Sequence, residues 1–325
     1  MSGQLNDGYD VVVVGGGAAG LNGALMLARS RRSVVVIDAG APRNAPATGV
    51  HGLLGREGMP PAELLERGRA EVRCYGGDVV TGEVAAVAPD NDEFEVTLAD
   101  GRTVRARRLL VATGLVDELP DIPGLADRWG RDVVHCPYCH GWEVRDKAIG
   151  VVATGPLSMH QALLFRQLSG DVVFFSNARP LAGEDAEQLA AKYVSVVDGK
   201  VASVEVAADR LVGVRLSDGT LVGCEALAVS PRMTARSGFL AKLGLKPAEH
   251  PGGVGEYIPA DPTGRSEVPG VWVAGNVTDL TAHVGAAAAA GALAGAQINA
   301  DLVLEDARRA VDARRDRLHL GHEGS

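Results

Sequence analysis

The N-terminal segment, residues 9–38, constrains the fold more strongly than any other part of the chain. It begins with YDVVVV, a short run of β-branched residues that stops at GGGAAG. LNGALMLARS follows with the apolar spacing of a helix, and SVVVIDAG is typical of a second buried strand. The order is therefore strand, glycine turn, helix and strand.

Each glycine of this turn has its own structural role. Gly15, Gly17 and Gly20 match the pattern G-x-G-x-x-G, and Asp38 ends the second strand. In such a pattern the first glycine makes the tight turn, the second lets the backbone approach a pyrophosphate, and the third lets helix and strand pack closely. The helix N-terminus holds the anion, and the aspartate accepts hydrogen bonds from ribose hydroxyls. The segment therefore predicts a dinucleotide-binding unit.

The rest of the chain repeats and completes this pattern. FEVTLADGRTVRARRLLVATG predicts antiparallel strands joined at the DG turn. AIGVVATGPLSMHQALLFRQL begins a second strand–turn–helix that leads to a strand at DVVFFSN, and GVWVAGNVTD precedes a helix of small residues. The expected fold class is α/β, and 325 residues suffice for about two domains.

Composition excludes several classes of function. The chain has 41 acidic and 32 basic residues, a formal net charge of −9, which gives no general attraction to nucleic acid or to an anionic membrane. The N-terminus lacks the basic and apolar regions of a secretory signal. No apolar run of roughly 18 to 20 residues is free of glycine, proline or charge. We expect a soluble, cytoplasmic protein.

Four motifs in this order resemble the low-molecular-weight thioredoxin reductase family, and the resemblance covers almost the whole chain. They are GGGAAG, the ATG at 112–114, a CxxC just before the second nucleotide fold, and GVWVAGNVTD. The resemblance implies two Rossmann-like, three-layer ββα domains, the second inserted in the first. Residues 1–117 and 248–325 would form the FAD-binding domain, and residues 118–247 a pyridine-nucleotide-type domain that carries the CxxC. It also implies a homodimer.

The resemblance assigns FAD contacts to particular residues. Gly15, Gly17 and Gly20 would approach the FAD pyrophosphate and Asp38 the adenosine ribose, whereas Ala112, Thr113 and Gly114 would close the domain and Gly275 and Asn276 would contact the ribityl chain. Asn276 departs from the family, which usually has aspartate there. An amide can still donate and accept hydrogen bonds, so we expect FAD binding to survive.

The second nucleotide fold departs further from the family. Its turn, ATGPLS, keeps only Gly155 at a glycine position, with Ser158 at the third. Thioredoxin reductases usually clamp the NADPH 2′-phosphate with histidine and arginines, where this chain has Ser176, Asn177 and Ala178. Without cations the phosphate loses charge-assisted hydrogen bonds, and Arg179 is the one nearby candidate. Three alternatives stay open: NADPH binds weakly, NADH is preferred to NADPH, or the second domain binds no nicotinamide cofactor.

The segment HCPYCHGWE, residues 135–143, admits several kinds of site. A structural zinc site needs four ligands, and Cys136 and Cys139 supply two; His135 and His140 could add two only if the chain folded back tightly. We therefore predict no metal. A glutaredoxin module is disfavoured because the CPYC lies between two nucleotide folds. A disulfide that exchanges electrons with the flavin remains, since CxxC spacing lets both sulfurs sit at a helix start.

The residue after the second cysteine separates two branches of the family. Thioredoxin reductases generally have aspartate there, whereas CPYCHG is similar to the dithiol oxidases that close the disulfides of gliotoxin- and holomycin-type natural products. That similarity implies that Cys136 exchanges with a small-molecule dithiol, Cys139 lies beside the flavin and His140 is the general base, with O2 as electron acceptor. His135 either assists or caps local structure. His283 either shapes the substrate side or is structural.

Two other functions stay open at this point. One is a thioredoxin reductase-like enzyme that passes electrons from a nicotinamide to a protein disulfide, such as that of a thioredoxin-like protein. The other is a flavin-binding regulator without turnover. The intact CxxC with flanking histidines argues against the regulator, and the missing phosphate clamp favours the oxidase over the reductase.

Overall fold

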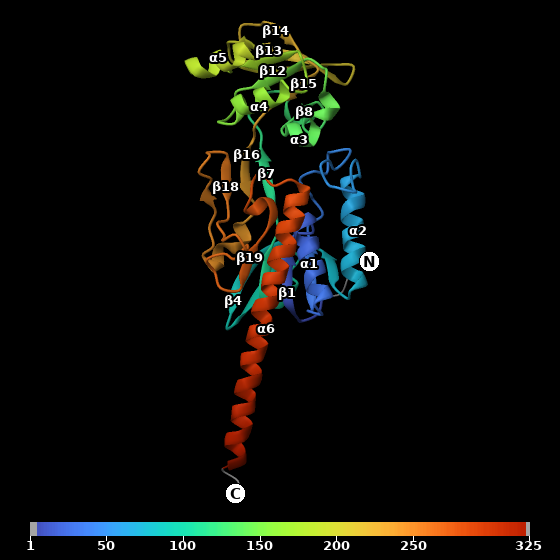
Figure 1. The fold of residues 1–325 in the computed structure, drawn as a ribbon, viewed down its shortest axis with the longest axis vertical. Coiled ribbons are helices and arrows are strands. Elements are labelled where there is room, and N and C mark those ends of the chain that lie inside the picture. The colour runs from blue at the N-terminus through green and yellow to red at the C-terminus, as the bar shows by residue number, and fades with distance from the viewer. Residues whose placement is uncertain (1–4, 323–325) are drawn as a thin grey trace.

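The first domain is built on a parallel sheet extended by an antiparallel hairpin (Figure 1). The computed structural model describes residues 5–322, with side chains to residue 317. The strands of this sheet run in the order β3-β2-β1-β6-β5-β4, and β19 pairs with β6. Their bounds are β1 (Gly8–Val14), β2 (Val34–Asp38), β3 (Asp78–Thr81), β4 (Val84–Asp90), β5 (Glu93–Leu98), β6 (Thr103–Val111) and β19 (Val271–Val273). The β-branched strands are buried because layers cover both faces.

Helices cover one face of this sheet: α1 (Ala18–Arg29), α2 (Pro61–Cys74) and α6 (Val284–His322). Glycines let α1 and α6 pack almost backbone to backbone. A Cβ on Gly291 would lie 1.9 Å from the carbonyl oxygen of Ala19, and one on Gly295 would lie 2.6 Å from that of Gly23. The run of small residues in α6 is thus explained by helix packing.

The second domain repeats the three layers. Its parallel sheet has the order β11-β10-β9-β15-β8, with helices α4 and α5 on one face and the antiparallel sheet β12-β13-β14 on the other. The bounds are β8 (Val133–Val134), β9 (Ile149–Val152), α4 (Ser158–Phe165), β10 (Val172–Phe175), α5 (Gly183–Ala191), β11 (Ser195–Val197), β12 (Val201–Ala207), β13 (Arg210–Leu216), β14 (Leu221–Gly223) and β15 (Ala226–Ala228). Two Rossmann-like units, one inserted in the other, confirm the predicted fold class.

The chain crosses between the domains twice, at β7 (Leu115–Glu118) and β16 (Arg232–Ala235), which pair antiparallel. β18 (Gly255–Tyr257) and β17 (Ala248–Glu249) extend this sheet. Ala235, Leu240 and Leu245 are buried in the same cluster as Val87 of the first domain. The sequence placed residues 232–247 in the inserted unit. Because these three side chains are buried against the first domain, we propose instead that the second boundary lies near residue 232.

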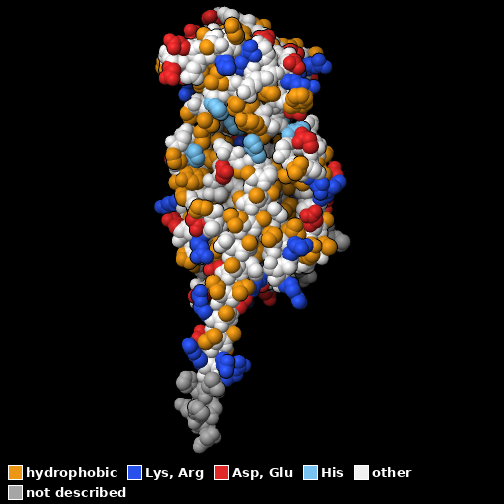
Figure 2. Space-filling view, in the orientation of Figure 1, with side chains coloured by type: hydrophobic (Ala, Val, Ile, Leu, Met, Phe, Trp, Pro, Cys, Tyr) orange, Lys and Arg blue, Asp and Glu red, His pale blue; other side chains and the backbone are white. Residues whose placement is uncertain are grey.

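The short elements and the C-terminal helix complete the chain. The short helices are η1 (Ala126–Arg128), α3 (Pro137–His140), η2 (Trp142–Val144), η3 (Gly238–Leu243) and η4 (Gly275–Val277). α6 runs past the end of the first domain, as Figures 1 and 2 show. Its span Val284–Arg317 is long and apolar enough for a membrane helix by length and composition, but a third of the most apolar window is buried in the protein. That single criterion is weak evidence for a membrane.

Candidate active site

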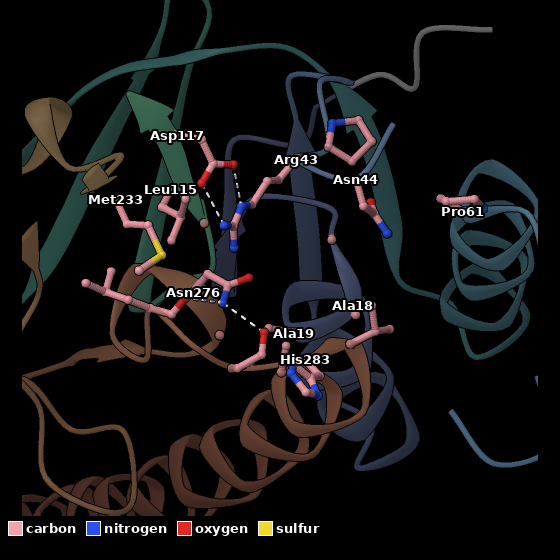
Figure 3. Close-up of a pocket in the computed structure, with 18 of the residues that line it drawn as sticks. Ala18, Ala19, Arg43, Asn44, Pro61, Leu115, Asp117, Met233, Asn276 and His283 are labelled. Carbon is pink, nitrogen blue, oxygen red and sulfur yellow. Dashed lines mark hydrogen bonds and ion pairs between the residues drawn. The ribbon is translucent and has the colours of Figure 1, made fainter. Parts of the chain in front are cut away.

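A cavity of about 940 Å³ lies where the two domains meet. Its walls come from the first glycine turn, the loop after β2, the ATG segment, the CPYC segment and the start of α6 (Figure 3). All of the predicted site residues except Gly20 line this one cavity; they are Gly15, Gly17, Asp38, Ala112, Thr113, Gly114, His135, Cys136, Cys139, His140, Gly275 and Asn276.

The first glycine turn fits a dinucleotide. Gly15 has a φ of +105°, and a Cβ there would lie 2.4 Å from the carbonyl oxygen of Ala112. A Cβ on Gly20 would lie 1.9 Å from the carbonyl oxygen of Gly15, so the third glycine serves helix packing and stays off the cavity wall. Gly17 has open space beside it. Among the described residues the amides of Gly16 and Gly17 have no hydrogen-bond partner, which leaves them for an anion.

Asp38 stands at the end of β2, beside this turn. Its Oδ1 accepts from the amide of Gly40 at 3.2 Å, and its Oδ2 is 3.1 Å from Nη2 of Arg69. Arg69 lies on α2, and no sequence motif pointed to it. The carboxylate is held in place by both contacts and still lines the cavity, as a ribose ligand should.

Asn276 is tied to the loop in front of α6. Its Nδ2 donates to the carbonyl oxygens of Asp279 at 3.0 Å and Ala282 at 2.9 Å. An ionised aspartate has only acceptors and could not make these contacts. The departure from the family's usual residue therefore has a structural consequence, because the amide fixes the loop that carries His283.

The cysteine pair sits at the start of α3. Cys136 immediately precedes the helix, and its Sγ lies 2.8 Å from that of Cys139. The hydrogen bond from Cys139 lowers the pKa of Cys136 to about 6, with His283 adding a smaller effect. The same hydrogen bond, together with burial, raises the pKa of Cys139. One proton is thus shared unequally, with Cys136 as the thiolate and Cys139 as the thiol.

The imidazole next to this thiolate belongs to His283. Its Nε2 lies 3.7 Å from Sγ of Cys136, and its ring faces Tyr138 with centroids 5.8 Å apart. The two sulfurs and this nitrogen all lie within 4.8 Å of one another. His283 is 144 positions beyond Cys139 in sequence, so only the fold brings it to the pair.

The two histidines that flank the cysteines have other environments. His135 contacts the carbonyl oxygen of Val229 at 3.1 Å through Nδ1, and burial lowers its pKa. Burial also lowers the pKa of His140, whose Nε2 is buried without a partner among the described residues. Neither ring hydrogen-bonds to a sulfur. The prediction that His140 acts as the base thus has no hydrogen bond to a sulfur behind it and stays a prediction.

The remaining cysteines are not part of the site. Cys224 is buried, and burial raises its pKa to about 12. Cys74 is exposed at the end of α2.

The second glycine turn differs from the first in its amides. Oγ of Ser158 accepts from the amide of Thr154 at 3.0 Å and from that of Gly155 at 3.1 Å. Ser158 is 2% exposed, so this contact lies inside the protein. After β10, Oδ1 of Asn177 accepts from the amide of Val201 at 3.0 Å. The side chain of Ser158 therefore occupies two amides of the turn that correspond to the amides of Gly16 and Gly17 in the first turn.

Comparison with known proteins supports the flavoprotein assignment. The family model of the pyridine nucleotide-disulphide oxidoreductases matches residues 9–292. The thioredoxin reductase tcpT of Claviceps purpurea is 34% identical over 91% of this chain and 95% of its own length. The thioredoxin reductase sirT of Leptosphaeria maculans is 30% identical over 90% and 93%.

Solved structures agree with these relatives. The crystal structure of HlmI is 45% identical, with a TM-score of 0.90 over 98% of this chain and all of that one. An oxidoreductase from Agrobacterium tumefaciens is 34% identical, with a TM-score of 0.86 over 91% of this chain and 99% of that one. FAD is the cofactor of thioredoxin reductase-like enzymes, and the open first turn fits it. The chain is a member of the pyridine nucleotide-disulphide oxidoreductase family, an FAD-dependent enzyme of the thioredoxin reductase-like group.

Proposed function

We propose that this enzyme is a dithiol oxidase that closes a disulfide in a small-molecule dithiol and passes the electrons to O2. The observation that carries the proposal is the contrast between the two glycine turns. In the first, the amides of Gly16 and Gly17 are free; in the second, Ser158 already binds the amides of Thr154 and Gly155. A pyrophosphate at the second turn would have to displace a buried hydroxyl from two hydrogen bonds.

Asn177 and Ala178, which follow β10, also support an oxidase, because they offer no positive charge to a 2′-phosphate. Asn177 and Ala178 have φ of 50° and 58°, and the Asn177 side chain is hydrogen-bonded to β12. These two residues therefore form a left-handed turn without a cation where a 2′-phosphate clamp is expected. The similarity of CPYCHG to the dithiol oxidase branch also supports an oxidase, whereas the names of tcpT and sirT, both thioredoxin reductases, favour the reductase.

In the proposed reaction the substrate dithiol loses two electrons and two protons and gains an S–S bond. Bound FAD would carry the electron pair from the cysteines to O2, which becomes hydrogen peroxide. Gly15, Gly17 and Asp38 would hold its adenosine diphosphate part, and Gly275 and Asn276 its ribityl chain. Cys136 would exchange with the substrate and Cys139 would lie on the flavin side. The buried Nε2 of His140 has no hydrogen-bond partner among the described residues, and the bound cofactor or substrate would supply one.

A reductase remains the second candidate because of Arg179. This exposed residue lines a smaller cavity of about 290 Å³ together with Thr154 and Gly155. Among the described residues it forms no ion pair, so it could meet a phosphate. A protein disulfide would then be the substrate. The cytoplasmic location and the homodimer remain expectations from sequence and resemblance.

Oxygen uptake by the purified holoenzyme tests the proposal. Dithiothreitol, as a small dithiol probe, should drive uptake and peroxide formation, whereas NADPH and NADH should not. Ser158→Gly frees the amides of Thr154 and Gly155 and should raise nicotinamide affinity roughly tenfold or more while leaving dithiol turnover unchanged. Ser169→Ala is the matched control, a buried serine of the same domain bound to Lys147 and Asp171. Uptake driven faster by NADPH than by the dithiol would refute the oxidase.

A further inference from the structure

The feature that leads beyond this scheme is the position of His283 opposite the exchanging sulfur. Its Nε2 lies 3.7 Å from Sγ of Cys136, although the two residues belong to different domains. The ring is exposed at the cavity, so a substrate thiol can reach it. Figure 3 places His283 at the top of α6, where it faces the cavity.

The loop around His283 is held by its own backbone and by Asn276. The carbonyl oxygen of His283 accepts from the amide of Ala287 at 2.8 Å, which makes His283 the residue that begins α6. Nδ2 of Asn276 binds the carbonyl oxygen of Ala282, the preceding residue, at 2.9 Å. The positive end of α6 also favours a negative charge at this point. The backbone that carries the imidazole is therefore held in place near the sulfur.

We propose that His283 is the catalytic proton-transfer residue of the dithiol half-reaction and that Asn276 is its positioning residue. This inference rests on the proposed oxidase function. It moves the role of base from the histidine that follows the CxxC to one that the fold supplies from the other domain.

The steps balance with the groups in place. The first substrate sulfur attacks Sγ of Cys136 in the oxidised pair, the Cys136–Cys139 bond breaks, and Cys139 takes the electron pair and the proton of that thiol. The second substrate thiol gives its proton to Nε2 of His283 and attacks the first substrate sulfur. The substrate disulfide forms, and Cys136 leaves as a thiolate beside an imidazolium. Two electrons remain on the pair, and FAD and O2 of the proposed reaction accept them.

The protonation of the pair agrees with the end point of these steps. The pKa of Cys136 is lowered to about 6, and that of Cys139 is raised. An imidazolium near the first sulfur stabilises its thiolate by charge attraction.

Few other groups face this pair. Tyr138 of α3 lies against the His283 ring, and Arg43, from the loop after β2, lowers the pKa of Cys139 by its charge. Arg43 is neutralised by two contacts of 2.7 Å with Asp117 of β7. His160 of α4 lines the same cavity. Of these side chains, that of His283 is the one within hydrogen-bond distance of Sγ of Cys136 among the described residues, and the backbone amides of Tyr138 and Cys139 also lower the pKa of Cys136.

The first test follows the reactivity of Cys136 without turnover. In a Cys139→Ser background, the rate of alkylation of Cys136 by iodoacetamide is measured by mass spectrometry from pH 5 to 9. His283→Ala should shift the midpoint to higher pH and slow alkylation at neutral pH by roughly three- to tenfold. His140→Ala is the control and should leave the midpoint in place. A profile unchanged by His283→Ala, or moved by His140→Ala instead, would overturn the proposal.

The second test measures dithiol turnover and its chemical rescue. His283→Ala should lower oxygen uptake with dithiothreitol by roughly 10²-fold while flavin content stays at the wild-type level. Free imidazole should restore part of the rate, because the site is exposed; a purely structural role would not respond. If the wild type oxidises the dithiol but His283→Ala is unimpaired, this inference fails and the oxidase stands. If the wild type itself is inactive with the dithiol, the proposed oxidase function fails. The alkylation profile then still shows whether His283 stabilises the thiolate of Cys136.

The role of Asn276 has its own variant. Asn276→Asp removes both donors to the loop and should raise the alkylation midpoint of Cys136 in the same direction as His283→Ala, by a smaller amount. Flavin content checks that the cavity is intact. A midpoint equal to that of the parent, with full flavin, would show that Asn276 does not position the histidine.

Discussion

At the scale of single residues, the central property of the site is the unequal ionisation of two neighbouring thiols. Sγ of Cys136 and Sγ of Cys139 are 2.8 Å apart, and the hydrogen bond between them favours the thiolate on the first. A thiolate attacks and leaves readily, whereas a thiol does neither, so the difference supports the proposal that Cys136 exchanges with the substrate.

This asymmetry predicts the pH dependence of alkylation in the reduced wild-type enzyme. A free cysteine has a pKa of about 8.5, so its reactivity rises mostly above neutral pH. Because the pKa of Cys136 is lowered to about 6, its alkylation should rise through pH 6 and be nearly complete by neutral pH. Cys139, whose pKa is raised, serves as the internal control. Equal labelling of both residues, with a shared midpoint above pH 8, would contradict the assignment.

At the scale of secondary-structure elements, the contact between α1 and α6 holds the cofactor domain together. A Cβ on Gly291 would fall 1.9 Å from the carbonyl oxygen of Ala19, which is backbone and cannot rotate away. The same helix begins at the active site directly after His283, so its placement on α1 also positions the residue that carries the imidazole.

Gly291→Ala should therefore destabilise the fold despite the better helix propensity of alanine. We expect the free energy of unfolding to fall by about 2 kcal/mol or more, with loss of flavin, as measured by urea unfolding of the holoenzyme. Gly183→Ala, in α5, is the control, since nothing lies within 4 Å of the added Cβ. Equal stability of the two variants would mean that α6 can move away from α1 without cost.

The sequence predicts the elements better than it predicts how they meet. The first glycine turn, the hairpin of β5 and β6, and the second strand–turn–helix follow from local periodicity and turn chemistry, and the structure has all of them. The segment 232–247 follows the apolar strand β15, and no local signal says which domain buries Leu240. The sequence pointed to His283 and Ser158 but could not predict their contacts, because His283 meets Cys136 across 147 positions and the Ser158 hydroxyl could equally face solvent.

At the scale of the whole molecule, the cavity between the domains joins two nucleotide folds that are no longer equivalent. The first has an open turn, and the second has a turn filled by Ser158. The CxxC faces the first domain, where His283 meets Cys136. Electrons can thus pass between a dithiol, the cysteines and the flavin within one cavity, whereas a nicotinamide would need a second site.

Anaerobic reduction of the flavin tests this account most directly. The oxidised holoenzyme is mixed in a stopped-flow instrument with dithiothreitol, NADPH or NADH, each at equal concentration, and the loss of the yellow flavin absorbance is followed. We predict rapid bleaching by the dithiol, which Cys136→Ser abolishes, and slow or absent bleaching by either nicotinamide. Rapid bleaching by NADPH with little by the dithiol would contradict the oxidase and restore the reductase.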